Sequence, residues 1–152
     1  MVLLYSFLIG GVCGLRSMTG PAVVAWGARL GWLHLDGSLL AFFANKISLI
    51  VFSLFAAGEL IADKLSFIPA RTQAGPLVVR IVFGALCAAA LCISAAVSPL
   101  AGGVLGALGA IAGTFAGYNY RRALGSKIPD LLLALIEDVV AVGGGLLLVS
   151  RM

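Results

Sequence analysis

Four carboxylates stand inside or beside strongly apolar stretches of this sequence. They are Glu59, Asp63, Glu137 and Asp138. Glu59 and Asp63 are four residues apart and therefore share one face of a helix. The other two acids would lie about 12 Å inside a helix that begins near residue 129. An isolated charge at that depth in a bilayer costs about 2.5–3.5 kcal/mol even on the mildest scale, so such groups pair or contact water.

Two arginines accompany these acids. Arg80 lies four residues inside an apolar stretch, and Arg16 stands at an interruption in the N-terminal one. Even complete pairing with these arginines leaves two of the four carboxylates for a proton, water or a cation. We favour such a binding role for Glu59 and Glu137, because acids at membrane depth are typical of proton relays and ion pathways. The alternative is a structural role, with pairs such as Glu59 with Arg80 and with Asp63 among the lipid head groups. This alternative is favoured for Asp63 and Asp138.

The N-terminal region contains two short apolar stretches, 2–15 and 21–33, separated by Arg16 to Pro21. Each is about 20 Å long as a helix, which is short for a hydrocarbon core of about 30 Å. Two short spans meeting at a cytoplasmic turn, a re-entrant hairpin, or one long tilted helix would each fit. In a hairpin, unpaired N–H groups at the start of the second stretch, beside Arg16, Ser17 and Thr19, would favour an anion or a phosphate head group.

The composition indicates the solvent that surrounds these elements. Apolar residues make up 62% of the 152 and charged residues 11%, against about 45–50% and about 25% in soluble domains. This excludes a disordered chain, a disulfide scaffold and a nucleic-acid-binding domain. Four further stretches, 38–64, 76–98, 100–122 and 129–151, are long enough to span a bilayer. We expect one all-α polytopic membrane domain over 1–152, with four full transmembrane helices plus the N-terminal pair.

The basic residues predict an orientation in the membrane. The loops at 64–76 and 121–128 are basic, so the positive-inside rule assigns both to the cytoplasm and the two termini to the outside. This is the pattern expected of a multi-pass protein of a bacterial inner membrane. Lys64 and Arg71 are candidates for contact with lipid head groups. The six stretches also allow a 3+3 inverted repeat, as in many transporters.

Small residues and the scarcity of metal ligands complete the picture. Gly109, Gly113 and Gly117 recur at four-residue spacing on one helix face, where another backbone can approach closely. The face serves either packing within the chain or a homodimer. The three cysteines form no CxxC motif and His34 is the one histidine, so no metal site and no cofactor is indicated.

Two strings, GLRSMTGP at 14–21 and GELIADKLSFIPART at 58–72, resemble a family of small bacterial integral-membrane proteins known as domain of unknown function 4126. The resemblance covers nearly the whole chain but implies no activity. It places Arg16, Glu59, Asp63, Lys64 and Arg71 at matching positions. Ser66 stands where the family pattern has a proline, which affects only the local turn.

These observations favour a small transporter or channel-like protein for an ion or small polar solute. Glu59 and Glu137 would bind the cation or proton, and Arg16 with the 17–21 turn would form a gate or an anion contact. A protein or enzyme that binds lipid phosphates through Asp63, Lys64, Arg71 and Arg80 is a second hypothesis. A structural subunit of a membrane complex is a third. Catalysis has the least support, because the sequence contains no nucleophile–base pair or metal-ligand spacing.

Overall fold

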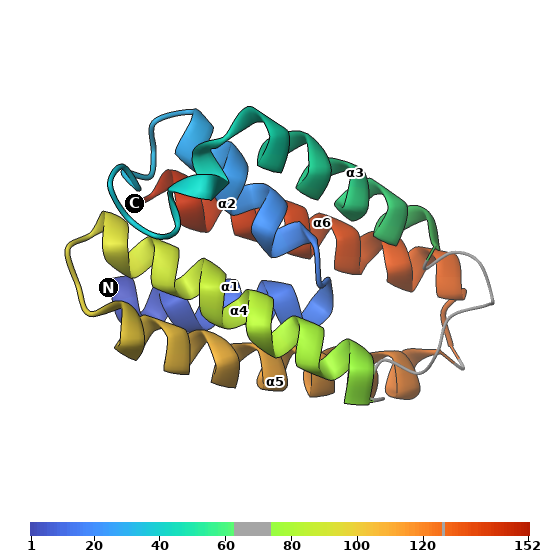
Figure 1. The fold of residues 1–152 in the computed structure, drawn as a ribbon. Helices are drawn as coiled ribbons and strands as arrows, with labels where there is room; N and C mark the ends of the chain where they lie inside the picture. Colours follow the sequence, from blue (N-terminus) through green and yellow to red (C-terminus); the bar gives the residue numbers. More distant parts are fainter. Residues whose placement is uncertain (63–73, 126) are drawn as a thin grey trace.

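We analysed a computed structural model, which describes residues 1–62, 74–125 and 127–152. Every regular element in these ranges is helical, so the all-α prediction is confirmed for them (Figure 1). The elements are α1 (Val2–Leu15), α2 (Thr19–Arg29), the 3₁₀ helix η1 (Ala41–Ala44), α3 (Lys46–Ala62), α4 (Ala74–Ser94), α5 (Pro99–Leu124) and α6 (Asp130–Ser150).

Within the residues that the structure describes, three helices, α4, α5 and α6, are long and apolar enough to cross a membrane. The stretch 38–64, expected to be a fourth full span, is not one continuous helix. It contains η1, and α3 begins only at Lys46. Asn45 causes this late start, because its Oδ1 accepts the backbone N–H of Ile47 at 3.0 Å and so caps α3. The described part of α3 is 17 residues long, or about 26 Å.

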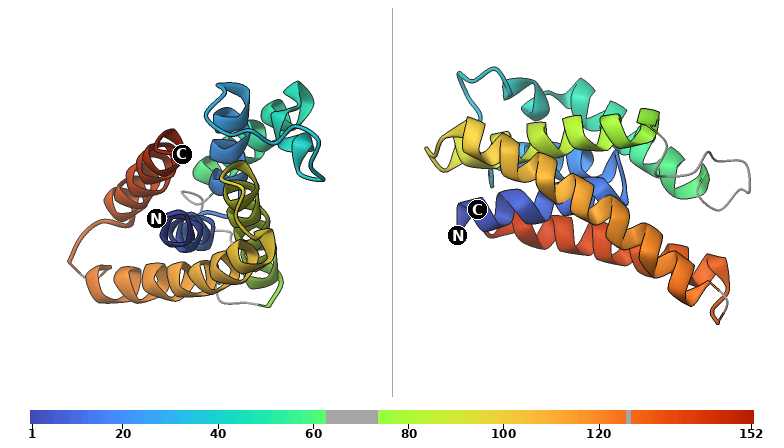
Figure 2. Two further views of the ribbon diagram at one scale, coloured as in Figure 1. Left: turned by 90° about the vertical axis from the view of Figure 1, so that its left-hand side faces the viewer. Right: turned by 90° about the horizontal axis from the view of Figure 1, so that it is seen from below.

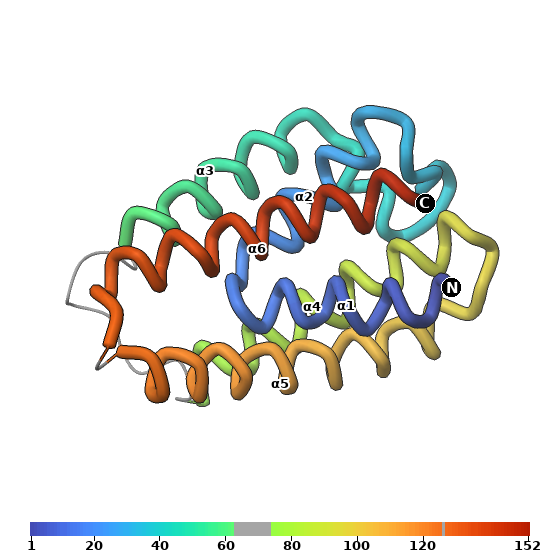
Figure 3. Tube along the Cα trace, turned by 180° about the vertical axis from the view of Figure 1, so that it is seen from behind, coloured from blue at the N-terminus to red at the C-terminus, as the bar shows by residue number. Residues whose placement is uncertain are grey.

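The N-terminal segment breaks where the sequence predicts an interruption. Helix α1 ends at Leu15 and Arg16 is extended, with φ −141° and ψ 113°. Helix α2 then begins at Thr19 and runs back toward the end of the bundle where α1 starts, at an angle to α1, so the alternative of one long helix over residues 1–33 is wrong. Figures 1 and 3 show that this turn lies partway along the longer helices α5 and α6, not level with their ends.

Close backbone packing holds α1 against α5 and α5 against α4. A Cβ atom on Gly109 would overlap the carbonyl oxygen of Phe7, and one on Gly113 would overlap that of Gly11. The glycine face of α5 is thus filled by α1 of the same chain (Figure 2). A homodimer through Gly109, Gly113 and Gly117 stays a prediction, and the first two of these glycines already serve packing within the chain.

The outer surface of the bundle is strongly apolar. Leu54, Leu100 and Val139 are 68%, 79% and 71% exposed. So many exposed large apolar side chains are unusual for a soluble monomer, and lipid is the solvent that fits them. Both termini lie at one end of the bundle with the turn 95–98, and the α5–α6 connection lies at the opposite end (Figure 1).

Candidate functional site

The break between α1 and α2 exposes backbone groups at the end of α1, and side chains of other helices bind them. The carbonyl oxygen of Gly14 accepts hydrogen bonds from Arg80 Nη1 of α4 at 3.0 Å and from Thr114 Oγ1 of α5 at 3.1 Å. Arg80 Nε also donates to Ser17 Oγ at 3.3 Å. A cation near a helix C-terminus is favourable because the helix dipole is negative there. Arg80 therefore stabilises one side of the break.

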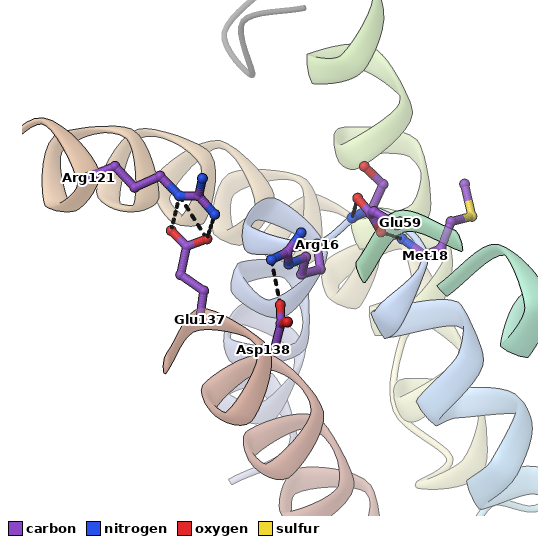
Figure 4. A network of polar contacts seen from close by, with 7 residues as sticks. Arg16, Met18, Glu59, Arg121, Glu137 and Asp138 are labelled. Carbon is purple, nitrogen blue, oxygen red and sulfur yellow. Dashed lines mark hydrogen bonds and ion pairs between the residues drawn. The ribbon is translucent and has the colours of Figure 1, made fainter. Parts of the chain in front are cut away.

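Glu59 of α3 binds the other side of the break. Its Oε1 accepts the backbone N–H of Ser17 and its Oε2 that of Met18, each at 2.8 Å (Figure 4). These two N–H groups lie at the N-terminal end of α2, where the dipole favours an anion. The sequence predicted that an anion binds at this helix start. In the structure the Glu59 carboxylate of the same chain occupies that position.

Arg16 lies at the tip of the hairpin and forms an ion pair with Asp138 of α6 (Figure 4). Arg16 is only 1% exposed, and by residue volume it is the largest fully buried residue in the described ranges. A buried ion pair of this kind gives modest net stability, but removing one partner leaves an uncompensated charge at high cost. Arg16 therefore fixes the hairpin to α6.

Glu137, next along α6, pairs with a residue that the sequence analysis assigned to the cytoplasmic loop. Arg121 of α5 donates from Nε to both carboxylate oxygens at 3.2 Å and from Nη2 to Oε2 at 2.8 Å. Glu137 is 4% exposed, whereas the Arg121 side chain is 23% exposed. Both residues lie near the short α5–α6 connection. A long arginine side chain at the end of one helix can reach a carboxylate inside the next, and this reach was the one indication of the pair in the sequence.

We call these residues together the polar cluster: Arg16, Ser17, Glu59, Arg80, Arg121, Glu137 and Asp138. Arg121 is a third base beside the two expected arginines, so the cluster holds three arginines and three acids. Asp63, Lys64 and Arg71, which the sequence also singled out, lie outside the described residues. The surplus of acid expected from the sequence is therefore absent from the described part of the cluster.

Two cavities border the cluster on different sides. One, of about 360 Å³, lies between α5 and α6 and is lined by Glu137, Gly117 and Tyr120 among others. The other, of about 480 Å³, lies between α3, α4 and the hairpin turn, and Glu59 and Met18 are among its lining residues. Thr19 lines neither of these cavities. It is buried and is one of the residues around a third cavity between α2, α3 and α6.

The helical bundle, its three helices of spanning length and its apolar exterior define a protein of the helical membrane class. Residues 3–150 match the model of the family described as "Domain of unknown function (DUF4126)", and the chain belongs to this family. The resemblance seen in the two sequence strings is thereby confirmed. Comparisons with curated proteins and with solved structures gave no match.

Proposed function

We propose that this protein is a small inner-membrane transporter or channel-like protein that moves an ion or a small polar solute. One observation carries the proposal: a helical hairpin reverses inside the bundle and its tip meets charged side chains from α3, α4 and α6. Non-helical backbone is tolerated at membrane depth where it is buried in protein or lines an aqueous cavity. Broken helices whose ends face buried ionisable groups are typical of transporter binding sites.

Glu59 is the first ion-binding group in this proposal. Its carboxylate is half-buried, and no residue of α3 is fully buried, so few packing contacts oppose movement of this helix. Hydrogen bonds to an ionised carboxylate are about twice as strong as neutral ones. A proton or a cation on Glu59 would weaken its bonds to Ser17 and Met18 and free the turn to contact a solute in the adjoining cavity of about 480 Å³.

Glu137 is the second ion-binding group in this proposal. It faces the cavity between α5 and α6, and its partner Arg121 lies closer to the basic end of the bundle. The Glu137 carboxylate would alternate between two partners, Arg121 and a cation or proton. This exchange of partners would move charge past the hairpin tip. Arg16, held by Asp138, would form the gate between the Glu59 and Glu137 sides.

Flux into proteoliposomes tests this assignment. Liposomes containing the protein and a trapped pH-sensitive dye receive an inward proton gradient, and parallel samples receive sodium, potassium or chloride gradients. We expect one of these gradients to dissipate several times faster than in protein-free liposomes. The rate should fall to the protein-free level in both Glu59→Gln and Glu137→Gln.

Asp130→Asn supplies the matched control. It makes the same acid-to-amide change at a residue that is exposed at the start of α6. Its flux should equal that of the native chain. The elution volume in size-exclusion chromatography and the unfolding midpoint are measured for every variant. Native values of both show that a variant without flux is still folded. Unchanged pH-dependent flux in Glu137→Gln, or native flux no faster than leakage for all four ions, would reject the transport proposal.

A structural subunit of a membrane complex is the second candidate, and the balanced charges of the polar cluster favour it. In that case the ion pairs only hold helices together. Neutral replacements at Glu59 and Glu137 would then lower the unfolding midpoint while the native protein shows no flux. A homodimer would be one form of such an assembly, and cross-linking in the membrane detects it.

A further inference from the structure

Helix α3 is held in the bundle differently from the other helices. It lies at the outer edge (Figures 1 and 2), and none of its described residues is buried. Each of the other α-helices contributes several buried residues in the described ranges. A helix without buried side chains lacks the close packing that fixes its neighbours, so the position of α3 depends on a few specific contacts.

Aromatic side chains anchor the first half of α3. The ring centroid of Phe52 lies 5.5 Å from that of Phe43 in η1 and 6.0 Å from that of Phe83 in α4, which it meets edge to face. Phe43 is fully buried, and Phe52 and Leu49 are the α3 side chains that pack on the buried core in the described ranges. Aromatic pairs at these separations add to the stability that burial gives. This half of α3 therefore stays attached to η1 and α4.

The second half of α3, residues 54–62, has a cavity on each side. From Ser53 onward the helix lines both cavities of about 480 Å³, one shared with α2 and α6 and the other with α4 and the hairpin turn. Ser53 accepts a hydrogen bond from Trp26 of α2 at 3.2 Å. Beyond it, the side-chain hydrogen bonds of α3 to other described parts of the chain are both made by Glu59. Open space on two sides leaves little packing to oppose a sideways movement of this half.

Glu59 attaches this second half to the hairpin turn. Its two carboxylate oxygens accept the backbone N–H groups of Ser17 and Met18, each at 2.8 Å (Figure 4). Hydrogen bonds to an ionised carboxylate are about twice as strong as neutral ones. Because both bonds use the same carboxylate, neutralising it weakens both contacts at once.

Few other charges face this contact. Of the elements packed against α3, α2 carries Arg29 at its far end and η1 carries no charge, whereas Arg80 of α4 binds the same turn through its Nε. The turn itself carries Arg16, which pairs with Asp138 of α6. Among the described residues at this turn, Glu59 is therefore the carboxylate whose charge controls the attachment of α3.

We infer that α3 is a hinged arm that pivots about Phe52 and is released from the hairpin turn when the Glu59 carboxylate is neutralised. The pivot lies in the half that packs on the core, and the released part is the half that borders the two cavities. Its movement would widen the cavity at the turn and uncover the N–H groups of Ser17 and Met18. The inference rests on the proposed function, because it describes how the ion-binding site at Glu59 is regulated.

Distances between spin labels in nanodiscs test this movement. One pair joins Ile61→Cys, in the second half of α3, to Leu108→Cys on α5, and a control pair joins Ile47→Cys, at the start of α3, to the same reference. All three positions are exposed, and the native cysteines are buried and should take no label. Glu59→Gln removes the charge and leaves one acceptor oxygen in place of two. We expect it to add a second distance, several ångströms from the first, in the Ile61 pair and to leave the Ile47 pair unchanged.

Acidification supplies a second measurement on the native glutamate. Between about pH 8 and about pH 4, which spans the titration of most carboxyl groups, the Ile61 pair should gain the same second distance, whereas Glu59→Gln should show it throughout. Asp130→Asn, the same acid-to-amide change at the exposed start of α6, should keep the native distribution. An unchanged Ile61 pair in Glu59→Gln, equal changes in both pairs, or an acid response that Glu59→Gln retains would each overturn the inference.

These distances are measured independently of flux. A fixed α3 in Glu59→Gln together with flux that depends on Glu59 would reject the hinged arm and keep the transport proposal. Movement of α3 in a protein that shows no native flux would reject the transport proposal alone.

Discussion

Arg16 is the residue on which the hairpin tip most depends. Replacing it with methionine keeps the volume but leaves the Asp138 carboxylate buried and without its ion pair. We expect Arg16→Met to lower the free energy of unfolding by about 3–5 kcal/mol, the usual cost of breaking a buried pair from one side. The measurement is the unfolding midpoint in detergent, followed by circular dichroism.

The double variant Arg16→Met with Asp138→Leu distinguishes a pair from two separate effects. Removing both charges should recover most of the lost stability, since apolar replacements of buried ion pairs are often neutral. Arg122→Met serves as the control, because this arginine is exposed at the end of α5. A double variant as unstable as the sum of the two single variants would show that Arg16 and Asp138 do not act together.

The burial of these charged side chains could be expected from the sequence, but their partners could not. Arg16 and Glu137 were expected to lie within the bundle, and both are buried. A pair of Glu59 with Arg80 was considered, yet Glu59 binds backbone N–H groups of Ser17 and Met18. Those donors exist only once the helix breaks, and no spacing rule in a single sequence indicates which carboxylate reaches them.

Among the elements, the contact of α5 with α1 depends on backbones that nearly touch. Gly109→Ala would force a Cβ against the carbonyl oxygen of Phe7, which cannot move without shifting α1. We expect a loss of about 1–3 kcal/mol in the free energy of unfolding, the range for overpacked cores. The same unfolding measurement detects it.

Gly144→Ala is the matched control for this prediction. No atom lies within 4 Å of a Cβ built at Gly144 of α6, so the added methyl meets open space. Alanine is the better helix former by about 0.5–1 kcal/mol, and we expect an unchanged or higher midpoint. Equal effects of the two substitutions would contradict the close α1–α5 contact.

Helical structure followed from the apolar runs, whereas the number of full spans and the helix boundaries followed less well. The stretches 76–98, 100–122 and 129–151 correspond closely to α4, α5 and α6. The stretch 38–64 does not correspond to one helix, because apolar character continues through η1 while the Asn45 cap decides where α3 begins. Hydropathy indicates which segments lipid surrounds, whereas local hydrogen bonds determine where each helix begins and ends.

For the whole molecule, both termini lie at one end of the bundle, and which end faces the cytoplasm stays a prediction from the basic loops. The hairpin returns the chain to its starting end, so both termini lie beside the turn 95–98. The α5–α6 connection, with Arg122 and Lys127 near it, lies at the other end. If the first 33 residues crossed the membrane an odd number of times, the two termini would lie at opposite ends of the bundle. The distribution of basic residues alone did not decide between an odd and an even number.

Cysteine labelling in membrane vesicles tests this topology as a whole. The three native cysteines, Cys13, Cys87 and Cys92, are each 0% exposed and should not react with a membrane-impermeant maleimide. Ser98→Cys and Asp130→Cys add exposed thiols at opposite ends of the bundle, and neither changes a basic residue that sets orientation. In right-side-out vesicles Ser98→Cys should be labelled at once and Asp130→Cys only after permeabilisation. Labelling of both from one side would mean that α5 does not cross the bilayer, because only a crossing α5 separates these two positions.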